Sequence, residues 1–250
     1  MRGDMDDTKE LKIKLLRYYQ ENSHNKKNFN IANFAHISDG WENEVYAFTL
    51  KHGDGREDLI LRIYPGDNSQ AKSSHEFNGM QNLYKQGYPV PQVFIHERDT
   101  SWFGSSFMIM QKINGRSMGE AIAKSTPERK NELMTRFCQL FVDLHKLDFQ
   151  PFLIPLFAGQ DLNDPYLFVD LTLKECRYYL DVLNHHEFDV VIDWLEAHSK
   201  DVPCKRLSAI HRDFHSLNIL LTPTDDTFVI DWTGISVGDY RYDLAWTLLL

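Results

Sequence analysis

The pattern of apolar and polar positions predicts a small β-rich region in the first half of the chain. Residues 45–50 and 59–64 are rich in β-branched and aromatic side chains, and a Gly-Asp-Gly turn separates them, which is typical of a β-hairpin. Residues 77–84 then carry apolar side chains at helical spacing, before a glycine and a proline that can end a helix. Strand patterns return at residues 92–96 and 105–111. Strands, one helix and further strands together predict an α+β lobe.

Helical periodicity dominates the rest of the chain. The clearest helix is expected to start at the run Ser125-Thr126-Pro127-Glu128, because this run has the spacing of a capping box and places proline in the first turn. Further helices are predicted at about residues 167–184 and 188–199. Residues 8–20 also show helical spacing, and we expect Thr8 to cap this short flanking helix.

The sharpest change of pattern falls near Asn114 and divides the chain into three expected regions. We predict a helical flank over residues 1–30, a β-rich lobe over residues 31–113 and a mostly helical lobe over residues 114–250. The last apolar run stops without a capping residue, a glycine or a proline. We therefore expect the natural chain to continue, which would make the helical lobe of this sequence truncated at its C-terminal end.

Composition narrows the class of protein. Hydrophobic residues make up 42% of the 250 residues, which is enough to form a buried core. The formal net charge is -9, so the chain lacks the basic footprint of a nucleic-acid-binding protein and better fits a neutral or cationic small substrate. The three cysteines form no C-x-x-C pair, which argues against a disulfide framework or a zinc site. No apolar run is long enough to span a membrane and the N-terminus is acidic, so we expect a cytoplasmic protein without a membrane partner. The pattern indicates no oligomeric state.

The segment most informative about chemistry covers residues 211–232. Asp213 is followed five residues later by Asn218, and a second carboxylate, Asp231, ends an apolar strand pattern. Phosphoryl transfer from a magnesium nucleotide requires a carboxylate that orients the acceptor hydroxyl, and oxygen ligands that hold the metal. Each of these residues alone would more often be a turn or strand-end residue. Their joint spacing predicts Asp213 as the catalytic base or positioning residue, and Asn218 and Asp231 as magnesium ligands.

Several motifs around this segment resemble the aminoglycoside phosphotransferase and choline kinase-like family, a branch of the protein-kinase-like fold. They are a hinge at residues 110–115, a Leu-His-x-Leu-Asp helix end at residues 144–148, the catalytic segment itself and a Gly-Asp-x-x-x-Asp-Leu-Ala run at residues 238–245, and they lie in the family's order. The combination is far more specific than any one motif. The resemblance implies an α+β, bilobal fold with a small β-rich N-terminal lobe and a larger, mostly helical C-terminal lobe, and it implies ATP and Mg²⁺ as cofactors.

The resemblance also implies nucleotide-binding residues in the first lobe. Arg62 matches a strand cation that grips the phosphates, and Glu76 matches a helix carboxylate that pairs with this cation. The backbone of Met110, Gln111 and Lys112 in the hinge would hold the adenine. Arg62 could alternatively extend from a sheet face and keep its charge in water.

Other polar residues of these motifs are expected to support the site. We expect His211 and His215 to brace the catalytic loop, because their spacing around Asp213 matches no zinc motif. Asp239 and Asp243 are expected to fix the loop and cap the following helix. The acidic helix near residue 190 is expected to face solvent, although it could also attract a cationic substrate.

Three features leave the acceptor open. The His-Arg-Asp segment has the form found in protein kinases, whereas the small-molecule family often has glycine between the His and the Asp. Trp232-Thr233 after the metal carboxylate, and the lack of an Ala-Pro-Glu motif after it, favour the small-molecule branch.

Residues 38–43 resemble the family's phosphate-covering loop but hold one glycine. We predict an ATP-dependent phosphotransferase that acts on the hydroxyl of a small molecule such as an aminoglycoside, an amino alcohol or a sugar. The alternatives are a protein kinase-like enzyme and a nucleotide-binding module without turnover.

Overall fold

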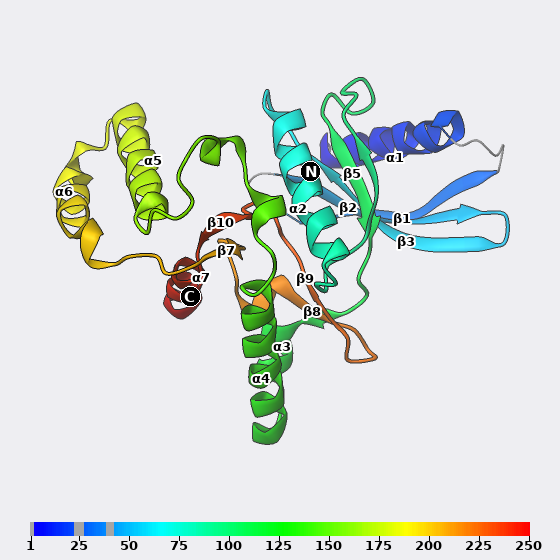
Figure 1. Cartoon of the computed structure of the whole chain (residues 1–250). Helices are drawn as coiled ribbons and strands as arrows, with labels where there is room; N and C mark the ends of the chain where they lie inside the picture. Colours follow the sequence, from blue (N-terminus) through cyan, green and yellow to red (C-terminus); the bar gives the residue numbers. More distant parts are fainter. Residues whose placement is uncertain (1–2, 23–27, 39–42) are drawn as a thin grey trace. The chain divides into compact units, whose positions relative to one another are not determined.

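The computed structural model describes residues 3–22, 28–38 and 43–250 (Figure 1). The chain divides into two compact units. The first unit comprises Met1–Leu133 and Ser216–Thr233, and the second comprises Met134–His215 and Gly234–Leu250. The boundaries that the sequence suggests for a flank and two lobes remain predictions. Most of the proposed phosphate-covering loop lies outside the described residues.

A five-stranded antiparallel sheet forms the larger part of the first unit, in the order β1-β2-β3-β5-β4. Its strands are β1 (Phe29–Ser38), β2 (Glu44–His52), β3 (Gly55–Ile63), β4 (Val93–Glu97) and β5 (Phe107–Gln111). The predicted hairpin is confirmed as β2 and β3, whose pairing ends at His52 and Gly55. The helices that accompany the sheet are α1 (Gly3–Asn22) and α2 (Ser69–Lys85), and α2 includes the helix predicted at residues 77–84.

The side chains of β3 alternate between two environments. Leu59 and Leu61 belong to a hydrophobic core that also contains Tyr18 of α1. Ile60 and Arg62, the residues that follow them, line a pocket together with residues of α2. The two-residue period of a strand therefore separates a structural face from a face that carries charge.

A second, smaller sheet completes the first unit. It consists of β6 (Arg116–Ser117), β8 (Ile219–Leu221) and β9 (Thr227–Val229), in the order β6-β8-β9. Helix α3 (Met118–Ala123) follows β6, and the 3₁₀ turn Ser216–Asn218 precedes β8. Gly115, at the end of the hinge, lies so close to β8 that a Cβ atom there would overlap with the carbonyl oxygen of Leu221. The close approach explains why this position of the hinge is glycine.

The second unit is mainly helical. Helix α4 (Pro127–Leu144) begins within the predicted run 125–128 in the first unit and continues into the second. The other helices and strands of the second unit are α5 (Leu167–Leu183), α6 (Asp189–His198), α7 (Tyr240–Leu249), β7 (Leu207–Ile210) and β10 (Ser236–Asp239). Strands β7 and β10 pair antiparallel. Further 3₁₀ turns lie at Gln150–Phe152, Pro155–Phe157, His186–Phe188 and Ser199–Asp201.

The structure differs from the sequence-based expectations at two elements. Helix α1 begins at Gly3, so Thr8 lies inside it and the prediction that Thr8 caps the helix was wrong. Strand β1 was not predicted, because two register irregularities and a positive φ at Asn33 interrupt its alternation. Helix α6 lies where it was expected, and its residue Trp194 is 60% exposed. Within the described part of the chain, none of the helices combines the length and apolar character needed to cross a bilayer.

Candidate active site

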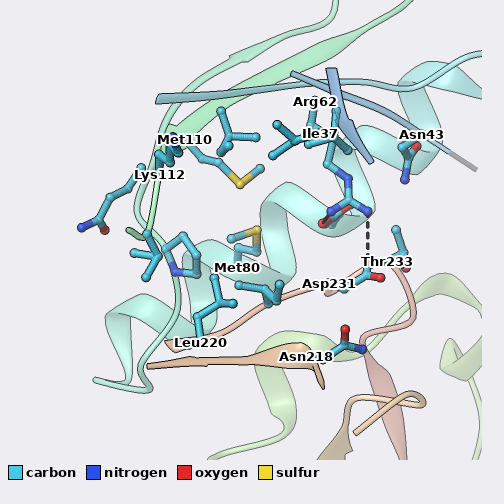
Figure 2. Close-up of a pocket in the computed structure, with 17 residues that line it drawn as sticks. Ile37, Asn43, Arg62, Met80, Met110, Lys112, Asn218, Leu220, Asp231 and Thr233 are labelled. Atoms are coloured by element: carbon cyan, nitrogen blue, oxygen red, sulfur yellow. Dashed lines mark hydrogen bonds and ion pairs between the residues drawn. The ribbon is translucent and has the colours of Figure 1, made fainter. Parts of the chain in front are cut away.

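A cavity of about 560 Å³ lies within the first unit (Figure 2). Its lining includes every residue predicted to bind nucleotide or metal: Arg62, Glu76, Met110, Gln111, Lys112, Asn218 and Asp231. Apolar side chains form much of the remaining wall, among them Met80, Ile113 and Leu220. Ligand pockets typically combine such apolar walls with a few convergent polar groups.

Arg62 connects the two carboxylates of the pocket. Its Nη1 lies 3.2 Å from Oε1 of Glu76, and its Nη2 donates to Oδ1 of Asp231 at 2.9 Å (Figure 2). Burial opposes the charge of Arg62, but Glu76 and then Asp231 more than offset this effect and hold the pKa of Arg62 above its ordinary value. The guanidinium is therefore a fixed positive charge in a largely buried position. Pairing with two carboxylates excludes the alternative of a side chain that simply extends into water.

Tyr64 is a buried partner of this pair that the sequence analysis missed. Its hydroxyl donates to Oε2 of Glu76 at 2.8 Å, and Glu76 is only 1% exposed. Burial and the charge of Glu76 raise the pKa of Tyr64 well above its ordinary value, so the phenol remains a neutral donor. Arg62 and Tyr64 are two residues apart, the spacing of side chains on one face of an extended chain. That spacing was the signal in the sequence that could have identified Tyr64.

Asn218 precedes β8 and Asp231 follows β9, and the antiparallel pairing of these two strands brings the two residues together. The amide of Ile230 donates to the carbonyl of Asn218 at 2.9 Å, which ties the residue before Asp231 to Asn218. Asp231 has a φ of 65°, an uncommon conformation for a residue with a side chain, and such conformations cluster at functional sites. Figure 2 shows Asn218 and Asp231 lining one end of the pocket.

The donor set of this end of the pocket fits Mg²⁺ in the presence of a nucleotide. Among the described residues, no group of three or more His, Cys, Asp or Glu side chains could hold a metal ion by itself. Asn218 and Asp231 offer amide and carboxylate oxygens, the hard ligands that Mg²⁺ prefers. Magnesium usually keeps several waters and binds one or two protein oxygens together with substrate phosphates. A partial ligand set beside an arginine is consistent with that mode of binding.

The predicted hinge residues Met110, Gln111 and Lys112 all line the pocket, and two of their backbone amides have partners within the protein. The N–H groups of Gln111 and Lys112 donate to the carbonyls of Gln92 and Asp58, at 2.8 and 3.2 Å. These two amides are therefore used within the protein. Ile113, the next hinge residue, also lines the pocket and was not among the predicted residues.

The second unit carries the loop with Asp213, and buried Asp243 organises that loop. Oδ2 of Asp243 accepts the backbone N–H of His211 at 2.8 Å, and Oδ1 accepts the backbone N–H of Arg212 at 2.7 Å. Nε2 of His145, in the Leu-His-x-Leu-Asp motif, lies 3.0 Å from Oδ2 of Asp243. Asp239 caps α7 by accepting the N–H of Arg241 at 2.9 Å. The expectation that these carboxylates fix the loop and cap the helix is confirmed.

Asp213 is the predicted site residue that belongs to the second unit, whereas the others line the pocket of the first. Its Oδ1 accepts the indole N–H of Trp246 at 2.7 Å, and its Oδ2 lies 3.3 Å from Nε2 of His215. The backbone N–H of Asp213 donates to Nδ1 of buried His211 at 3.2 Å. Both histidines thus contact Asp213, as expected of residues that brace the loop. The contact with Trp246 was not predicted.

Comparison with known proteins identifies a family and several proteins to which this chain is similar. Residues 33–250 match the model of a family described as phosphotransferase enzymes. Among curated proteins, acyl-CoA dehydrogenase family member 11 of Pongo abelii is 25% identical over 199 residues, which covers 76% of this chain and 25% of the relative. The chain therefore spans about a quarter of the length of that relative. The activity in its name belongs to a much longer protein.

Solved structures show the same fold. A candidate aminoglycoside phosphotransferase from Ralstonia eutropha JMP134 has a TM-score of 0.68 and 18% identity, over 95% of this chain and 69% of that chain. Choline kinase LicA from Streptococcus pneumoniae has a TM-score of 0.57 and 12% identity, over 94% of this chain and 72% of that chain. Another structure of LicA contains AMP. The predicted α+β, protein-kinase-like fold is confirmed by these similarities.

Proposed function

Because this chain belongs to the phosphotransferase enzyme family that matches its residues 33–250, we propose that it transfers the γ-phosphoryl group of ATP to the hydroxyl of a small molecule. The observation that carries the proposal is the pocket of the first unit. Arg62 there bridges Glu76 and Asp231, and Asn218 lines the same cavity. A fixed cation beside oxygen ligands suits a phosphate chain and its metal.

Each residue has a distinct part in the proposed reaction. Arg62 neutralises phosphate oxygens, because its planar fork of N–H donors remains charged. Asn218 and Asp231 would hold Mg²⁺, which would supply positive charge to neutralise the phosphates. Asp213 accepts a hydrogen bond from the acceptor hydroxyl and takes its proton as the oxygen attacks phosphorus. Backbone groups of the hinge near Ile113 hold the adenine between apolar side chains.

The acceptor class rests on the family and on the names of its members. Amino alcohols, aminoglycosides and sugars are the acceptors we propose, since the structural relatives include a choline kinase and a candidate aminoglycoside phosphotransferase. A hydroxylated acyl-CoA is added for testing, because the curated relatives are named acyl-CoA dehydrogenases. The cytoplasmic location and the lack of a nucleic-acid partner remain proposals from the sequence.

The proposal is tested by magnesium-dependent ADP release with a panel of acceptors. The panel contains choline, ethanolamine, aminoglycosides, sugars, a hydroxyacyl-CoA and a generic protein, and the enzyme is compared with Asp213→Ala. Asp201→Asn is the matched control, because it removes an exposed carboxylate of the same unit outside the catalytic loop. We expect one small-molecule class to stimulate turnover in the parent and the control, and Asp213→Ala to lose all but a small residual turnover. Stimulation by protein alone would establish a protein kinase, and nucleotide binding without turnover would establish a binding module.

A further inference from the structure

Both oxygens of the Asp213 carboxylate are contacted by side chains of the second unit. Nε1 of Trp246, in α7, donates to Oδ1 at 2.7 Å, and Nε2 of His215, in the loop itself, lies 3.3 Å from Oδ2. The shorter contact comes from the residue that is distant in sequence. Since the Asp side-chain torsion next to the carboxylate is broad and roughly two-fold, such a donor can select one orientation of the group.

Trp246 belongs to a row of residues on α7 that hold the catalytic loop. Asp243 binds the backbone N–H groups of His211 and Arg212, and the hydroxyl of Thr247 donates to the carbonyl of Phe214 at 2.6 Å. Positions 243, 246 and 247 are three and four residues apart, so they share one face of the helix. The same helix face therefore fixes the loop backbone before and after Asp213 and also contacts its carboxylate.

We propose that Trp246 is a positioning residue for the phosphoryl transfer, which aims the carboxylate of Asp213 at the acceptor hydroxyl through its indole N–H. This inference rests on the proposed function, because it gives Asp213 the part of base. An indole N–H is a donor only and does not titrate, so it holds the carboxylate without competing for the proton.

The kinetic test compares Trp246→Phe with Trp194→Phe, using the acceptor that the panel identifies. Phenylalanine keeps an aromatic ring but has no N–H donor, and Trp194 is an exposed indole of the same unit in α6. We expect Trp246→Phe to lower kcat by about ten- to a hundredfold, the factor that corresponds to one hydrogen bond to a charged group, with KM for ATP unchanged. Trp194→Phe should match the parent. Equal kcat values for the two variants would overturn the proposal.

A double variant separates positioning from a general effect on folding. If Trp246 acts through Asp213, Trp246→Phe should cause no further loss of residual turnover in an Asp213→Ala background. A residue that merely supports the fold would lower turnover by the same factor in both backgrounds. That second result would contradict the proposed role.

A spectroscopic measurement tests the contact without turnover. The assigned Nε1–H resonance of Trp246 in a ¹⁵N–¹H spectrum should move in Asp213→Ala and stay in place in Asp201→Asn. An unmoved resonance in Asp213→Ala would refute the inference even if the enzyme is active. If the resonance moves but no acceptor is phosphorylated, the contact between Trp246 and Asp213 is supported. The proposed function is then contradicted. The measurement also remains decisive if Trp246→Phe fails to fold.

Discussion

The ion pair between Arg62 and Glu76 allows the electrostatics of the pocket to be tested by stability alone. Glu76 is 1% exposed and the Arg62 side chain is 13% exposed, so neither charge is well solvated. Replacing Arg62 with methionine leaves the buried carboxylate of Glu76 without its cation. Removing one partner of a buried ion pair typically costs about 3–5 kcal/mol, mainly because the remaining charge is uncompensated. We therefore expect Arg62→Met to lower the free energy of unfolding by about 3 kcal/mol.

The companion variants separate the charge effect from lost packing. Glu76→Gln should cost less than Arg62→Met, because Arg62 keeps Asp231 at 2.9 Å. The double variant Arg62→Met/Glu76→Gln removes both charges and should recover about 2 kcal/mol relative to Arg62→Met. Arg56→Met is the matched control on the same strand, since Arg56 is 63% exposed and lies 3.4 Å from Asp58. Exposed pairs contribute about 0–1 kcal/mol, so the control should remain close to the parent.

Urea unfolding followed by circular dichroism measures these differences. Native-state hydrogen exchange of the amides of β3 and α2 should show the same order of protection in the first unit. Equal stabilities for Arg62→Met and the double variant would mean that Glu76 is not held as an uncompensated carboxylate. An Arg62→Met variant as stable as Arg56→Met would refute the reasoning altogether.

Three further predictions concern other buried or strained residues. Tyr64→Phe should lower the free energy of unfolding, measured in urea, by about 1–3 kcal/mol, because Glu76 loses a buried hydrogen-bond donor. A variant as stable as the parent would show that the phenol hydroxyl is dispensable. Arg212 has a φ of 71°, so Arg212→Val should lower the free energy of unfolding by about 1–2 kcal/mol while Arg212→Gly is tolerated. Thermal unfolding of the two variants measures the difference, and equal midpoints would show that the backbone at residue 212 is not strained. Burial and the nearby Glu97 raise the pKa of Tyr18 to about 12 from 10. The stability gained by keeping this phenol neutral is therefore present below about pH 10 and lost between about pH 10 and 12. Tyr18→Phe should not show this loss. Phenolate absorbance and unfolding, measured together across this pH range, test the prediction.

Local sequence patterns were sufficient to predict the hairpin, whereas the nucleotide-binding residues of the pocket were predicted from the family resemblance. The β2–β3 turn and the start of α4 follow from turn and cap chemistry that involves neighbouring residues only. Arg62 was assigned through the family resemblance, as the strand cation that pairs with the helix carboxylate Glu76, and the structure brings these two side chains together. The predicted roles of Arg62 and the other pocket residues in catalysis remain to be measured.

Features that depend on distant partners could not be predicted in the same way. The contact between Trp246 and Asp213 joins residues 33 positions apart, and neither residue has a local pattern that indicates the other. Strand β1 escaped detection because its bulges break the alternation by which strands are recognised. Helical spacing placed Val191, Trp194 and Leu195 on one face of α6, and these side chains are between 40% and 60% exposed. Periodicity identifies the helix, whereas burial depends on what packs against it.

The two carboxylates of the predicted chemistry are held in place by structure outside their own residues. Arg212, next to Asp213, and Asp231 both have positive φ values, which cost energy for residues with a Cβ atom. Buried Asp243 binds the N–H of Arg212, while Trp232, fully buried after Asp231, anchors its indole to the carbonyl of Val229 at 2.9 Å. Local strain of this kind persists only where surrounding contacts over-determine the backbone. The glycine that the family often has at the position of Arg212 relieves such strain directly, so this chain must rely on the hydrogen bonds of Asp243 to keep the same loop.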